Sequence, residues 1–218
     1  MIATETEARQ VDAPADVLTR IRAQTRELHR SVERRVPLFD PGLDLPAYVG
    51  WLRLMGAFHA RVEQALQAAG FEAATGWTHR SRAELAAQDL AALGLQPDGI
   101  DHADRCFAGL ELPATVPGLA GALYVVEGSA LGARVILKQV GRQLGLSAQH
   151  GASFLAPHGE DPGPRWSACL ELLHALARDD ARADAIVAGA VQTFGALDQA
   201  AARWQAGSLR TTAIPASP

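Results

Sequence analysis

The sequence has little cysteine, and its two thiols form no metal or redox pattern. Cys106 and Cys169 lie far apart, and neither belongs to a CxxC or Cys/His motif. Their placement excludes a zinc finger or a disulfide framework as the basis of the fold. We predict that both cysteines are buried thiols.

The motifs of several common enzyme classes are also absent. The chain has seven histidines but no HExxH motif, no pair of ExxH motifs and no cluster of carboxylates at metal-binding spacing. It also lacks the GxSxG elbow of hydrolases and a phosphate-binding loop. A hydrolytic zinc site and a di-iron carboxylate site are therefore not expected.

Long runs of one kind of residue are missing as well. The formal net charge is -4 without any basic run, which argues against nucleic acid as a partner. The apolar run at residues 118–126 ends at Glu127, well short of the roughly 20 residues that cross a membrane. The N-terminal residues do not resemble a signal peptide, so we expect a cytoplasmic protein with no membrane partner.

Hydrophobic periodicity typical of helices is present over most of the chain. It predicts an all-α fold in a single domain over residues 15–206, with disordered tails at residues 1–14 and 207–218. Asp44 and the Ser81-Arg-Ala-Glu84 pattern are signals for helix N-termini. Residues 149–164 form the longest predicted loop, which we expect to be mobile. The predicted helices cover residues 15–35, 45–70, 81–94, 100–110, 118–145, 165–178 and 181–205.

The helix at residues 118–145 contains Gly121, Gly128 and Gly132, although alanine would be more stable by roughly 1 kcal/mol at each position. With 3.6 residues per turn, Tyr124, Gly128 and Gly132 share one face, which is a strip of bare backbone. Two explanations fit such a strip. It allows either close packing of another helix or close approach of a ligand to the backbone.

His29 has the most informative surroundings of the histidines. It lies beside the apolar stripe of the first predicted helix, and Arg22 is two turns earlier on nearly the same face. An imidazole with a cation two turns away suits haem, which carries iron at its centre and propionates at its edge. A structural histidine at a helix edge is the alternative. We expect His59, His79, His102, His150, His158 and His174 to be surface or packing residues.

Two segments resemble one known family. Residues 21–33 (IRAQTRELHRSVE) look like the proximal helix of haem oxygenases, and residues 123–133 (LYVVEGSALGA) look like their distal helix. The second is especially similar to the bacterial branch that includes enzymes supplying biliverdin to bacteriophytochromes. The resemblance implies a haem-oxygenase-like bundle of about seven or eight helices, in which haem is held between the two segments.

The resemblance also implies an activity and its central residues. Haem would be both cofactor and substrate, and dioxygen with an external electron donor would convert it to biliverdin, ferrous iron and carbon monoxide. His29 would be the iron ligand. Gly128 and Gly132 would form the distal floor, where a missing side chain leaves room for dioxygen.

Ser129 departs from the animal members of the family, in which an aspartate at this place orders a water network. A hydroxyl can donate and accept hydrogen bonds, but it cannot be an anionic anchor. The network would then be held by Ser129, by water or by Arg134. The structural alternative is a bond from Ser129 to its own helix backbone.

For the propionates, Arg22 corresponds by its spacing from His29 to a basic residue of the family. Tyr124 and Lys138, at the two ends of the glycine helix, are further candidates, and Phe194 resembles an aromatic of the distal wall. Solvated charges or core packing are the alternatives for these residues. Arg142 and Arg165 are weaker candidates for basic residues that follow the distal helix.

The expected partners follow from this activity. They are haem, an electron donor such as a ferredoxin or a reductase, and a bacteriophytochrome as candidate biliverdin acceptor. A haem carrier or sensor without turnover is an alternative, because Ser129 replaces the aspartate. An enzyme of similar fold acting on thiamine pyrimidines is a third hypothesis, but Cys106 and Cys169 lack the context of its catalytic cysteine.

Overall fold

The computed structural model describes residues 16–36, 38–95, 100–157, 159 and 161–211. Within these residues the chain forms eight α-helices, one 3₁₀ turn and no β-strand, which confirms the all-α prediction. The elements are α1 (Val17–Arg35), α2 (Leu45–Ala68), α3 (Phe71–Thr75), α4 (Arg82–Ala92), α5 (Ile100–Cys106), α6 (Val116–Leu144), η1 (Ser153–Leu155), α7 (Gly163–Leu176) and α8 (Asp180–Thr211).

Side-chain caps set several of the helix starts. The Asp44 carboxylate accepts from the amide of Ala47 at 2.9 Å, and the Ser81 hydroxyl accepts from the amide of Glu84 at 3.0 Å. Both groups satisfy amides that a helix N-terminus leaves unpaired. α6 ends at Gly145, whose φ of 70° is accessible to glycine at little cost. These boundaries agree with the sequence prediction, whereas the short helix α3 was not predicted.

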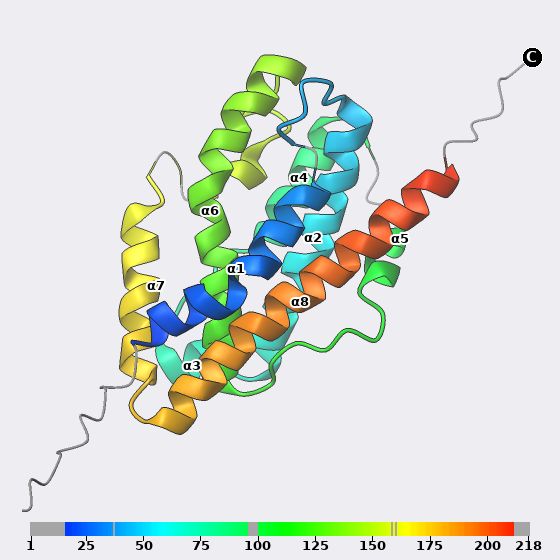
Figure 1. The fold of residues 1–218 in the computed structure, drawn as a ribbon. Helices are drawn as coiled ribbons and strands as arrows, with labels where there is room; N and C mark the ends of the chain where they lie inside the picture. Colours follow the sequence, from blue (N-terminus) through cyan, green and yellow to red (C-terminus); the bar gives the residue numbers. More distant parts are fainter. Residues whose placement is uncertain (1–15, 37, 96–99, 158, 160, 212–218) are drawn as a thin grey trace, which may run out of the picture.

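The helices surround one hydrophobic core that draws residues from all the long helices. In Figure 1, α1 and α8 lie side by side, while α6 and α7 form the neighbouring side of the bundle. α8 continues to Thr211, into the segment that the sequence assigns to a C-terminal tail. The predicted N-terminal tail, residues 1–14, lies outside the described residues.

α6 and α8 meet through glycines. A Cβ added to Gly121 would lie 2.0 Å from the carbonyl oxygen of Ile186, and one added to Gly189 would lie 2.0 Å from the carbonyl oxygen of Gly118. Real Cβ atoms do not approach backbone that closely, so both positions require glycine at this crossing. The helix-packing explanation therefore holds for Gly121.

α6 is apolar enough over its length to span a membrane, but 56% of its most apolar stretch is buried inside the fold. Its buried residues include Leu119, Leu123 and Val126. Extensive contacts with α8 and α7 cover it. The helix therefore has the burial of a core helix.

The segment predicted as a mobile loop is instead anchored over part of its length. Phe154 and Leu155 are buried within η1. The buried Asp89 carboxylate accepts from the amides of Ser153 and Phe154, each at 2.8 Å. A charged acceptor that holds two amides fixes this turn to α4.

Candidate functional site

A cavity of about 360 Å³ lies between α1, α2, α4, α6, η1, α7 and α8. Its walls are mainly nonpolar and include Trp51, Met55, Phe58, Phe154 and Leu197. Polar groups are few, as in many sites that bind a small organic ligand. They belong to His29, Glu33, Arg82, Tyr124 and Ser129.

His29 contributes to the cavity from α1. The helix buries Leu18 and Ile21 against the core, which leaves His29 at the edge of the buried face with a side chain 56% exposed. Its Nδ1 lies 3.4 Å from a carboxylate oxygen of Glu33, one turn later. Its ring also meets Phe194 edge-on, with centroids 5.6 Å apart. The structure thus brings His29 and Phe194 together at one cavity.

The opposite wall is formed by α6, whose glycines have different neighbours. A Cβ added to Gly132 would meet nothing within 4 Å, whereas one added to Gly128 would lie 3.3 Å from the Trp166 ring. Tyr124, one turn before Gly128, also contacts Trp166, with ring centroids 5.1 Å apart. The cavity is lined by both glycines and by the two aromatic residues Tyr124 and Trp166. Gly132 therefore offers open backbone, while Gly128 makes room for an aromatic side chain.

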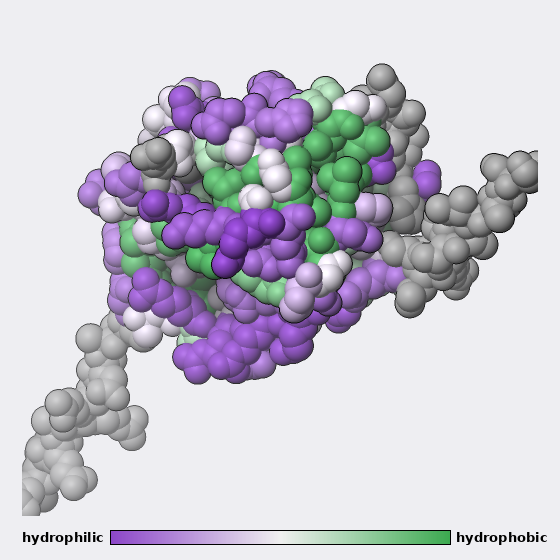
Figure 2. Space-filling view, turned by 90° about the horizontal axis from the view of Figure 1, so that it is seen from above, coloured by the Kyte–Doolittle hydropathy of each residue, from purple (hydrophilic) through white to green (hydrophobic). Residues whose placement is uncertain are grey.

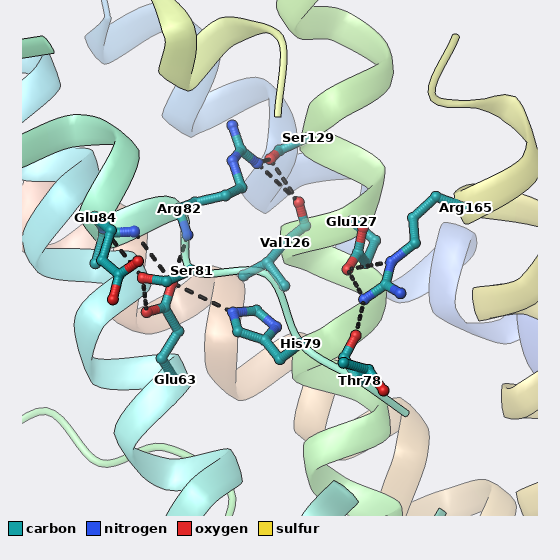
Figure 3. A network of polar contacts seen from close by, with 11 residues as sticks. Glu63, Thr78, His79, Ser81, Arg82, Glu84, Val126, Glu127, Ser129 and Arg165 are labelled. Carbon is teal, nitrogen blue, oxygen red and sulfur yellow. Dashed lines mark hydrogen bonds and ion pairs between the residues drawn. The ribbon is translucent and has the colours of Figure 1, made fainter. Parts of the chain in front are cut away.

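Ser129 is held by a residue that the sequence analysis did not single out. Its hydroxyl donates to the carbonyl of Val126 at 2.7 Å, as the structural alternative predicted, and accepts from Arg82 at 2.6 Å. Figure 3 shows the Arg82 side chain reaching from α4 to α6, where it also donates to the Val126 carbonyl. Arg134 is exposed and does not line the cavity. Among the described residues, Arg82 is therefore the side chain that bonds to the Ser129 hydroxyl.

The Arg82 guanidinium is buried, with 5% of the residue exposed. It donates to the Phe154 carbonyl at 3.2 Å and lies 4.3 Å from the centroid of the Phe154 ring. Burial lowers the pKa of Arg82 to about 10, although the carboxylates of Glu127 and Glu63 oppose this shift. The group stays cationic at neutral pH. No local sequence pattern could show that the first residue of α4 points inward.

Glu63 of α2 fixes the start of α4 and hence the position of Arg82. Its carboxylate accepts from the Ser81 hydroxyl at 2.7 Å and from the Arg82 and Ala83 amides at 2.9 and 3.1 Å. Burial favours the neutral acid, but hydrogen bonds from His79, Ser81 and Ala83 outweigh it and lower the pKa of Glu63. A carboxylate from one helix thus caps the N-terminus of another.

His59 is a packing residue, as predicted, but its burial is complete. Its ring lies edge-on to Phe58 and Phe154. Neither ring nitrogen has a hydrogen-bond partner among the described residues. Burial, with the positive charge of Arg82 and the nearby His79, lowers the pKa of His59 well below its ordinary value. The imidazole is therefore neutral in the folded protein.

Several predicted basic contacts lie away from the cavity. Arg22 and Lys138 are exposed and are absent from the described residues that line it. Arg142 donates to the Lys138 carbonyl on its own helix. Arg165 is engaged by Glu127 and by the carbonyl of Thr78. The structure thus brings together His29, Tyr124, Gly128, Ser129, Gly132 and Phe194, but not these four basic residues.

The remaining candidates do not form a second centre among the described residues. Both cysteines are buried, as predicted, and burial raises the pKa of each thiol, so neither is an activated nucleophile. This disfavours the thiamine-pyrimidine hypothesis. No group of three histidine, cysteine or carboxylate side chains in the described parts could hold a metal ion. The side chain of His102 and the whole of His158 lie outside the described residues.

The mouth of the cavity is apolar. Phe39 and Leu131 line it and remain 58% and 41% exposed, and Val135 follows Leu131 one turn later. Seen from above, the molecule has a patch of hydrophobic residues enclosed by hydrophilic ones (Figure 2).

Comparison with known proteins places this geometry in a family. The family model described as Heme oxygenase matches residues 15–202. A heme oxygenase of Xanthomonas campestris pv. campestris is 38% identical over 124 residues, which are 55% of this chain and 67% of the relative. The solved structure of the NO- and CO-bound heme oxygenase from Neisseria meningitidis aligns with a TM-score of 0.71 and 28% identity. The alignment covers 87% of this chain and 92% of the Neisseria chain.

Proposed function

Because the chain belongs to the haem oxygenase family, we propose that it binds haem through His29 and cleaves it to biliverdin, ferrous iron and carbon monoxide. Family and fold support a haem-degrading enzyme. Beyond the family activity, the proposal specifies His29 as the iron ligand and biliverdin, ferrous iron and carbon monoxide as the products. It follows the bacterial, biliverdin-producing branch that residues 123–133 resemble.

The observation that carries the proposal is one imidazole at the edge of an apolar cavity that is also lined by two glycines of α6. His29 stands on α1, while Gly128 and Gly132 stand on α6. Glu33 lies beside Nδ1 of His29, which leaves Nε2 as the nitrogen that can ligate iron. A hydrogen-bonded second nitrogen is the usual way to orient a ligating histidine.

The residues present fit a flat, largely apolar macrocycle. Aromatic and aliphatic side chains from α2, η1 and α8 wall the cavity, and Phe194 stands beside His29. Haem would supply the iron on which dioxygen is activated and the ring that is opened. The chain would supply orientation, exclusion of bulk water and polar groups on one side.

On the α6 side these polar groups are Ser129 and Arg82. Gly132 offers backbone without a neighbouring side chain, so a small molecule has access there. The Ser129 hydroxyl, fixed by Arg82, can hold a water molecule in a set orientation. We propose that this cation and hydroxyl replace the aspartate of the animal enzymes in ordering distal water.

Three residues are proposed contacts for the propionates. Tyr124 lines the cavity, and its phenol would donate to a propionate. Arg22 precedes His29 by two turns on α1, and its exposed side chain is long enough to swing toward a negatively charged edge. Lys138 is the third proposed contact, on the exposed side of α6.

The proposed partners rest on charge and on the family resemblance. α1 exposes Arg22, Arg26 and Arg30 on the element that bears His29, although the whole chain is negative. We propose that an acidic electron donor, such as a ferredoxin or a reductase, docks beside α1. A bacteriophytochrome as biliverdin acceptor and a cytoplasmic location complete the proposal.

Haemin titration of the wild type and of His29→Ala tests the ligand. The wild type should bind one haemin with the absorption spectrum of a histidine-ligated haem, and His29→Ala should lose that spectrum. His174→Ala is a matched control, because His174 is also half-exposed and also faces a carboxylate, Asp16. An unchanged spectrum in His29→Ala would overturn the assignment.

A further inference from the structure

We infer that the partly buried Glu127–Arg165 ion pair is a positioning device that sets the Trp166 ring against α6 and so shapes one wall of the cavity. Neither charged residue is among the described residues that line the cavity. The pair would therefore act on the ligand through Trp166. The inference rests on the proposed function, because haem is the ligand that reports it.

The ion pair joins the start of α7 to the middle of α6. Nε and a terminal nitrogen of Arg165 each lie 3.2 Å from the same carboxylate oxygen of Glu127. The Glu127 side chain is only 6% exposed. The Arg165 side chain is 23% exposed, so water screens the pair less than it screens an ion pair on the open surface.

Arg165 is held on further sides. A terminal nitrogen donates to the Thr78 carbonyl at 2.8 Å, and the guanidinium lies 3.6 Å from the centroid of the Trp77 ring. Figure 3 shows the side chain between the α3–α4 connection and α6. A planar guanidinium with these partners has little rotational freedom. The guanidinium of Arg165 is thus held against α6 and against the α3–α4 connection.

Trp166 follows Arg165 directly in α7, so contacts that hold Arg165 also restrict where Trp166 can lie. Its ring lies against Gly128, where an added Cβ would approach it to 3.3 Å, and against the Tyr124 ring at 5.1 Å. Trp166 lines the cavity beside both residues. Without the ion pair, the first turn of α7 could move away from α6 and carry the indole with it.

A purely structural role is the competing explanation. In that case loss of the pair would lower the stability of the whole fold, and any effect on haem binding would not depend on Trp166. A double-mutant cycle separates the two, because groups that act through one another give non-additive effects. The cycle combines Glu127→Gln with Trp166→Leu.

Haemin dissociation constants are the first readout. Glu127→Gln should weaken haemin binding on the order of tenfold in the wild-type background, and by less than about twofold when Trp166 is already leucine. Glu171→Gln is the matched control, since Glu171 is an exposed carboxylate of α7. Equal losses in both backgrounds, or no loss in either, would overturn the inference.

The second readout needs no haem. In ¹H–¹⁵N spectra of the haem-free protein, Glu127→Gln should shift the indole signal of Trp166 and leave that of Trp204 in place. Arg165→Gln breaks the pair from the α7 side and should shift the same signal, so a single misfolded variant cannot decide the outcome. An unmoved Trp166 signal in both variants contradicts the inference. Failure of the wild type to bind haemin would instead contradict the proposed function.

Discussion

At the scale of single residues, Gly121, Gly128 and Gly132 of α6 show that one sequence feature can have several causes. Gly121 is required by the backbone of α8, Gly128 lies against Trp166, and Gly132 has no neighbour within 4 Å of an added Cβ. The sequence predicted a bare face. It could not assign each glycine to a neighbour, because those neighbours come from distant parts of the chain.

Gly132→Ala should therefore separate stability from binding. Since the added methyl group meets no atom of the protein, the substitution should raise the free energy of unfolding by about 0.5–1 kcal/mol through helix propensity. The same methyl group would project toward the proposed ligand and should weaken haemin binding. Chemical denaturation and haemin titration measure the two effects, and unchanged binding would remove Gly132 from the site.

Ser129 is where the handling of dioxygen would differ from that of the animal enzymes. Ser129→Ala removes the closest acceptor of the buried Arg82 cation, which should cost about 1.5–3 kcal/mol in the free energy of unfolding. Ser153→Ala is the matched control, because the Ser153 hydroxyl oxygen is buried without a partner among the described residues and its loss should cost almost nothing. Equal losses in the two variants would show that the Arg82 contact contributes nothing to stability.

His59 should make stability depend on pH. Its folded-state pKa lies well below 6.5, so below pH 6.5 the unfolded chain binds a proton that the folded protein does not. Stability should therefore fall with decreasing pH, with a slope of up to about 1.4 kcal/mol per pH unit from this group. Denaturation curves of the wild type and His59→Gln between pH 7 and 5 measure it. Identical slopes would contradict a neutral, buried His59.

At the scale of elements, the sequence was informative wherever the signal is local. The Asp44 and Ser81 caps and the long apolar stripes marked the helix starts. The anchoring of η1 was not predicted. The composition of this loop does not reveal that its amides donate to Asp89, over sixty residues earlier. Arg82 was missed for the same reason.

The α6–α8 crossing is the helix contact at which an added side-chain atom should be tolerated least. Gly121→Ala should destabilise the protein by about 3 kcal/mol or more, because its Cβ would meet the backbone of Ile186 and that backbone cannot yield as a flexible side chain can. Gly132→Ala, on the same helix, serves as the internal reference. A thermal unfolding midpoint of Gly121→Ala equal to that of the wild type would show that the two helices separate at little cost.

At the scale of the whole molecule, the sequence led to the fold and to two segments that line one cavity, but only in combination. His29 and the glycine helix lie about a hundred residues apart, and the fold places them across one cavity. The cationic residues predicted to contact the propionates are absent from the described lining of this cavity. Arg165 serves an internal ion pair, whereas Arg22 and Lys138 are exposed outside the cavity lining. Sequence spacing places such residues on a helix, but tertiary packing decides where long side chains point.

The proposed function requires that this chain consumes the haem it binds. The most direct measurement is the absorption spectrum of the haemin-loaded protein after ascorbate is added in air, followed through a single turnover. We predict that the haem band disappears and that the broad red absorption of biliverdin replaces it. An intact haem band under these conditions, with haemin still bound, would contradict the claim and leave a haem-binding protein without turnover.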